Sequence, residues 1–119
     1  MLLLKFNVLS KSEKLGIDNT KASFKDFGEK LKEECNEVYT EINNVHEEQD
    51  NINNIINLVR ETYDVIQVCI AILWKSHKLA KEKYKDNKLL KRENMAHNYK
   101  LLAKRQWSSE SKIEVEVKE

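Results

Sequence analysis

The sequence predicts an all-α protein, in which long helices form a bundle that is completed by oligomerisation. Turns favour glycine and proline, and the 119 residues contain two glycines and no proline. Apolar residues recur at steps of three and four, which is typical of amphipathic helices. Residues 65–74 are apolar on all sides, as in a helix that is buried all round. One chain has too few helices to cover that stretch, which favours a homodimer or homotetramer with a four-helix core.

The first helix is expected to begin near Ser23. Residues 1–22 have no helical pattern and are interpreted as an N-terminal arm or a short extra element. Ser23 and Asp26 have the spacing of a capping box, in which a hydroxyl and a carboxylate cap each other's free N–H groups. An apolar stripe follows and ends near Asn43 and Asn44. Its members are Phe24, Phe27, Leu31, Cys35, Val38, Ile42 and Val45.

A second helix is expected after the polar residues 46–51. One of its faces is apolar from the start, and from Val65 onward the opposite face becomes apolar as well. The first face consists of Ile52, Ile55, Ile56, Val59, Tyr63, Ile66, Ile70 and Leu73. The second face, with Val68 and Ile72, is expected to be buried too.

A third helix is expected from about Asn87 to Trp107, after a weak break at Asp86. Residues 23–107 would then form one helical domain. The tail, residues 108–119, contains an alternating Ile-Glu-Val-Glu-Val run. Period-two alternation is typical of a strand, so the tail is either a short strand or a frayed end.

Charge and apolar runs exclude several classes of protein. Residues 12–64 hold 13 acidic and six basic side chains, whereas residues 75–105 hold 11 basic and three acidic ones. This is not the basic excess of a nucleic-acid-binding protein, so no nucleic-acid polymer is expected as a partner. The longest apolar stretch, residues 65–74, spans ten residues and is interrupted by Gln67. It is about half of the ~20 residues that a spanning helix needs, so no membrane is expected either. Without a signal peptide, and with two cysteines interpreted as reduced core thiols, the expected location is cytoplasmic.

Acidic residues form two spaced motifs, Glu-Glu-x-x-Glu at residues 33–37 and Glu-x-x-Asp at residues 61–64. Residues three apart lie on one helix face, so the carboxylates of each motif are expected to converge beside an apolar seam. Burying carboxylates without partners costs several kcal/mol each. Because hard divalent cations prefer oxygen ligands, the pattern predicts a site for Mg²⁺, with Mn²⁺ as an alternative. A solvated charged face is the competing interpretation.

The two motifs, separated by 23 residues, resemble the signature of the MazG-like all-α nucleoside triphosphate pyrophosphohydrolases. Residues 97–107, His-Asn-Tyr-Lys-Leu-Leu-Ala-Lys-Arg-Gln-Trp, resemble the basic segment that closes many short members. The chain departs from the family pattern at Tyr63 and Gln106, where many members have glycine.

The resemblance implies a Mg²⁺-dependent enzyme that converts a (deoxy)nucleoside triphosphate to the monophosphate and pyrophosphate, for housekeeping of the nucleotide pool. The metal ligands would be Glu34, Glu37, Glu61 and Asp64. Glu33 would be catalytic, either as a further ligand or by orienting the attacking water. The phosphates of the substrate would be bound by Lys100, Lys104 and Arg105. Members of the family form dimers or tetramers.

Two other functions fit parts of the pattern. A non-catalytic coiled-coil interaction protein fits the heptad-like spacing of the first helix, but it leaves Glu61 and Asp64 unexplained in an apolar helix. A di-iron carboxylate bundle would use Glu-x-x-His pairs, and Glu93 is followed three residues later by Ala96.

Overall fold

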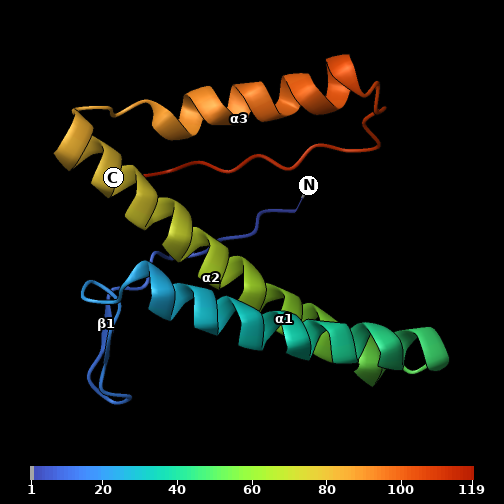
Figure 1. Ribbon diagram of the computed structural model, residues 1–119. Coiled ribbons are helices and arrows are strands. Elements are labelled where there is room, and N and C mark those ends of the chain that lie inside the picture. Colours follow the sequence, from blue (N-terminus) through green and yellow to red (C-terminus); the bar gives the residue numbers. More distant parts are fainter. Residues whose placement is uncertain (1) are drawn as a thin grey trace. The chain divides into compact units, whose positions relative to one another are not determined.

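The computed structural model describes residues 2–119 and is mostly helical (Figure 1). Its elements are β1 (Lys11–Ser12), β2 (Ile17–Asp18), α1 (Phe24–Glu47), α2 (Ile52–Tyr84), α3 (Leu89–Tyr99) and a π-helical turn, η1 (Lys100–Lys104). The predicted all-α class is therefore confirmed in its main features, with a small hairpin added. The four-helix core and the oligomeric state stay predictions.

The chain divides into two compact units, the first ending at Lys78 and the second beginning at Leu79. The first unit contains the hairpin, α1 and most of α2, whereas the second contains the end of α2, α3, η1 and the tail. The division of the chain into an arm, a domain over residues 23–107 and a tail stays a prediction.

The N-terminal residues form a short antiparallel hairpin in which Lys11 pairs with Asp18 and Ser12 with Ile17. Gly16 closes the turn with a φ of 66° and donates its N–H to the Glu13 carbonyl over 3.3 Å. Glycine adopts this left-handed conformation without the steric cost that other residues have. This hairpin lies within residues 1–22, for which an arm or a short extra element was expected.

The start of α1 confirms the predicted capping box. The Ser23 hydroxyl accepts from the Asp26 N–H over 3.1 Å, and the Asp26 carboxylate accepts from the Ser23 N–H over 2.9 Å. This hydrogen bonding lowers the pKa of Asp26 below its ordinary value. Two of the N–H groups that a helix start leaves without a partner are thereby satisfied.

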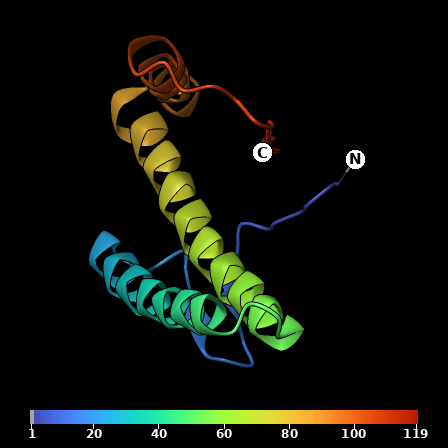
Figure 2. The ribbon, with the colours of Figure 1, turned by 90° about the vertical axis from the view of Figure 1, so that its right-hand side faces the viewer.

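Helices α1 and α2 run in opposite directions and lie side by side along the first unit (Figures 1 and 2). Near the start of α1, the Lys75 ammonium lies 5.1 Å from the centre of the Phe24 ring. Near its end, the Asn54 amide donates to the Asn44 carbonyl over 3.5 Å. The start of α1 thus contacts a late residue of α2, and the end of α1 contacts an early one. The two helices are therefore antiparallel.

Few apolar side chains are buried in the described part of the chain. Within residues 2–119, the buried apolar side chains are Phe27, Val68 and Ala80, and none of the described side chains is less than 2% exposed. The first apolar face of α2 remains largely open to solvent. Its exposed members are Ile52, Ile55, Ile56, Val59, Tyr63 and Leu73. The face of α2 that packs against α1 is the second one, which carries Val68.

In the second unit, α2 ends at Tyr84 and Lys85 adopts a left-handed φ of 55°. Asp86 then accepts from the Lys88 N–H over 2.9 Å and from the Arg92 guanidinium over 2.8 Å. These hydrogen bonds lower the pKa of Asp86. The predicted break is thus confirmed, and α3 begins at Leu89, close to the expected start at Asn87.

The tail contains no strand over residues 106–119, so the alternating run is not paired. Its last residue, Glu119, forms an ion pair of 3.3 Å with Lys81. The two cysteines, Cys35 and Cys69, are free thiols as expected. Both are exposed, so the interpretation as core thiols was wrong, because each lies on a helix face that the α1–α2 contact leaves uncovered. No helix in the described part of the chain has the length and apolarity to cross a bilayer.

Candidate metal centre

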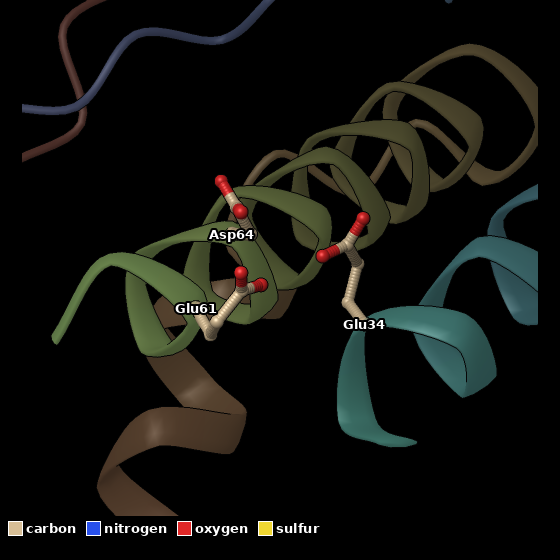
Figure 3. A group of neighbouring side chains, drawn as sticks. All are labelled: Glu34, Glu61 and Asp64. Carbon is tan, nitrogen blue, oxygen red and sulfur yellow. The ribbon is translucent and has the colours of Figure 1, made fainter. Parts of the chain in front are cut away.

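Three of the four predicted metal ligands meet between α1 and α2. Glu34 extends from α1, and Glu61 and Asp64 from α2, one turn apart (Figure 3). One carboxylate oxygen from each lies within 4.8 Å of the others. The i, i+3 spacing puts Glu61 and Asp64 on one face, and the antiparallel packing brings Glu34 opposite them.

Burial differs across this carboxylate cluster, which we define as Glu34, Glu37, Glu61 and Asp64. Glu34 is 6% exposed and Glu61 is half-buried, whereas Glu37 and Asp64 are exposed. The cluster is therefore closed on the helix–helix side and open to solvent at Asp64. A bound ion could keep water or ligand oxygens on the open side, as Mg²⁺ usually does.

Two buried oxygens of the cluster are without a hydrogen-bond partner among residues 2–119: Oε2 of Glu34 and Oε2 of Glu61. A buried acceptor without a partner costs free energy, and a charged one costs more. A divalent cation would satisfy both oxygens at once. The residues therefore fit a hard metal ion, although Mg–O distances of about 2.1 Å require the three oxygens to draw slightly closer together.

The fourth predicted ligand, Glu37, shares a proton with its neighbours. Hydrogen bonding to Glu61, and then to Glu34, raises the pKa of Glu37 to about 7, and the negative charges of both neighbours act in the same direction. Like-charged carboxylates that crowd one site favour a shared proton. Glu37 thus lies beside Glu61 and Glu34, one turn from Glu34 on α1, and its role as a metal ligand stays a prediction.

Lys30 is a member of the site that the sequence reasoning missed. Its ammonium lies 2.9 Å from Oε1 of Glu34 and 3.5 Å from Glu33. Contact with Glu34 raises the pKa of Lys30 above its ordinary value. The four-residue spacing of Lys30 and Glu34 is the signal that would have revealed the pair. Lys30 occupies Oε1 of Glu34 and leaves Oε2 without a partner among residues 2–119.

Glu33, the predicted catalytic residue, does not join the three oxygens that meet. Its side chain is 59% exposed and lies beside Lys30. A position next to Glu34 on the helix turns it by about 100° from that residue. Its assignment as a further ligand or a water-orienting residue stays a prediction.

The predicted phosphate-binding residues lie in the second unit. Lys100 and Lys104 begin and end η1, and Arg105 follows it. The Lys104 ammonium lies 5.8 Å from the centre of the Tyr99 ring. Gln106 has a φ of 55°, the left-handed conformation that glycine adopts most readily. Gln106, which follows Arg105, therefore adopts the left-handed conformation that a glycine would adopt at this position.

A scan against models of protein families found no match for this chain, and neither did searches of curated proteins and of solved structures. A function for the chain therefore has to be argued from the carboxylate cluster and from the spacing of its motifs.

Proposed function

We propose that this chain is a Mg²⁺-dependent nucleotide pyrophosphohydrolase that converts a nucleoside or deoxynucleoside triphosphate to its monophosphate and pyrophosphate. The observation that carries the proposal is the buried Glu34 carboxylate, which has an unpartnered oxygen and lies within reach of Glu61 and Asp64 of the neighbouring helix. The resemblance of the two acidic motifs to MazG-like enzymes gives the reaction.

The residues would divide the work between the metal and the substrate. Glu34, Glu61 and Asp64 hold a divalent cation, and Glu37 joins them once it has lost its proton. Such an ion neutralises phosphate charge, lowers the pKa of bound water and aligns the attack. Glu33 orients the attacking water, and the resemblance assigns the outer phosphates to Lys100, Lys104 and Arg105. Arginine suits this role because its guanidinium can bind two phosphate oxygens at once.

The enzyme would act as a homodimer or homotetramer. In a single chain, the first apolar face of α2 is exposed, with Val59 42% and Ile52 62% exposed. Monomeric proteins rarely expose a contiguous apolar stripe of this kind. A second copy that packs on the part of this face that precedes Tyr63, from Ile52 to Val59, would complete a four-helix core.

The exposed stripe also supports the other candidate, a helical interaction protein without catalytic activity. Such a protein would use the apolar face of α2 for a partner and would gain nothing from the carboxylate cluster. Metal dependence separates the two candidates, because only the enzyme needs the cation.

The test is pyrophosphate release from a panel of nucleoside and deoxynucleoside triphosphates, with Mg²⁺ and with Mn²⁺. We expect Glu61→Gln and Asp64→Asn to lower kcat/KM at least about hundredfold, since each removes a charged ligand while keeping the shape of the side chain. Glu29→Gln on α1 and Glu82→Gln on α2 are matched controls, because both are exposed glutamates outside the cluster. Equal activity in all four variants would place the active site elsewhere, and no release by the wild-type protein would favour the interaction protein.

A further inference from the structure

The segment before the hairpin lies against α2 beside the carboxylate cluster. The rings of Phe6 and Tyr63 meet edge to face, with centroids 5.5 Å apart and planes inclined by 80°. One residue further along, the Asn7 carbonyl accepts a hydrogen bond of 2.5 Å from the Gln67 side-chain amide. Two adjacent residues of the segment are thus fixed to two consecutive turns of α2.

These contacts lie on one flank of Asp64. Successive residues of a helix are turned by about 100°, which puts Tyr63 and Gln67 on one side of Asp64 and Glu61 on the other. Glu61 lies on the side of α2 that faces Glu34 of α1. The open carboxylate of the cluster therefore lies between α1 on one side and an aromatic pair on the other.

Tyr63 has the properties of a stacking surface. It is 39% exposed, although it is one of the larger apolar rings of the chain and lies next to a charged cluster. Phe6 is half-buried and can meet one face of Tyr63 only, because the pair is edge to face. An aromatic ring that is held by a second ring and keeps one side open can stack a planar ligand.

We propose that Tyr63 is the base-stacking residue of the carboxylate site and that Phe6 is a positioning residue that holds the Tyr63 ring. The ligand is a nucleotide whose phosphates lie at the carboxylate cluster and whose base lies on Tyr63. This inference rests on the proposed function and deepens it by naming the element that recognises the nucleoside part of the substrate. Base–aromatic stacking is tolerant of base identity, so it adds affinity for nucleotides over inorganic phosphates.

The experiment compares two probes that share phosphate chemistry and differ in the base. The first probe is pyrophosphate. The second is a set of nucleoside monophosphates, titrated separately, with the bases adenine, guanine, cytosine, uracil and thymine. Calorimetric titration in Mg²⁺ is made with the wild-type protein, Tyr63→Leu and Tyr63→Phe. Leucine keeps an apolar side chain against Phe6, and circular dichroism checks that the helices are retained.

We expect Tyr63→Leu to weaken binding of the monophosphates about tenfold or more, in keeping with the loss of one base–aromatic stack. Tyr63→Phe should bind them as the wild type does, and pyrophosphate should bind all three proteins equally. Phe6→Leu should show a smaller loss for the monophosphates alone.

Three results would overturn the inference. They are equal monophosphate affinity in the wild type and Tyr63→Leu, a parallel loss for pyrophosphate that marks a structural role, and no monophosphate binding by the wild type. The proposed function fails separately, if the wild-type protein releases no pyrophosphate from any triphosphate. Because the titrations need no turnover, the two failures are distinguishable.

Discussion

At the scale of single residues, the account depends on the way Glu34 is held. One of its oxygens contacts Lys30 and the other is buried without a partner in the described chain. The sequence predicted that Glu34, Glu61 and Asp64 would meet, because their spacing fixes the helix face of each carboxylate. The four-residue spacing of Lys30 and Glu34 indicates an ion pair, but the sequence does not show that this pair, among several on a charged helix, is the one at a buried glutamate.

The shared proton at Glu37 gives a pH dependence whose sign follows from the pKa. The pKa of Glu37 is about 7 in the folded protein, against an ordinary value of 4.5. The protonated form thus favours the folded state: its contribution to stability is fully present below about pH 4.5 and is lost as the pH rises through 7. A cation competes with this proton, so metal affinity should rise over the same range.

We therefore expect the melting temperature of the metal-free protein to fall more steeply between pH 5 and pH 8 in the wild type than in Glu37→Gln, which cannot ionise. Thermal melting in a chelator at several pH values measures the difference. Groups outside the carboxylate cluster titrate in both proteins alike and cancel in the comparison. Identical pH profiles would show that Glu37 carries no shared proton.

At the scale of elements, the sequence located the helices well. The capping box fixed the start of α1 at Phe24, and the polar run 46–51 contains the connection to α2, which begins at Ile52. The face on which the helices pack was harder to predict. Both faces of α2 are apolar beyond Val65, and periodicity gives the width of an apolar face but does not identify what covers it.

The open face of α2 leads to a prediction about self-association. We expect the wild-type chain to sediment as a dimer or tetramer and Val59→Asp to shift it toward monomer, because a charge buried without a partner costs several kcal/mol. Asn57→Asp is a suitable control, since it adds the same charge at an exposed polar position of the same helix. A wild-type chain that sediments as a monomer at all concentrations would leave the proposed four-helix core without support.

At the scale of the whole molecule, the small buried core and the buried carboxylates both limit the stability of the folded chain. Folding leaves marginal stability after large opposing contributions, and burying one oxygen of Glu34 without a partner reduces it further. The sequence could predict the acidic cluster but not its accessibility, because burial arises only when two helices distant in sequence pack. The contact of Phe6 with Tyr63 could not be predicted either, since residues 2–9 have no periodic pattern from which a contact 57 residues away can be inferred.

Cation binding by the carboxylate cluster is measured by titrating the metal-free protein with Mn²⁺, with the paramagnetic resonance signal of the free ion as the readout. We expect Mn²⁺ binding by the wild type and by the control Glu82→Gln, competition by Mg²⁺, and affinity at least about tenfold weaker in Glu61→Gln and in Asp64→Asn. A free-ion signal that wild-type protein does not reduce, or reduces no more than the two cluster variants do, would contradict this expectation.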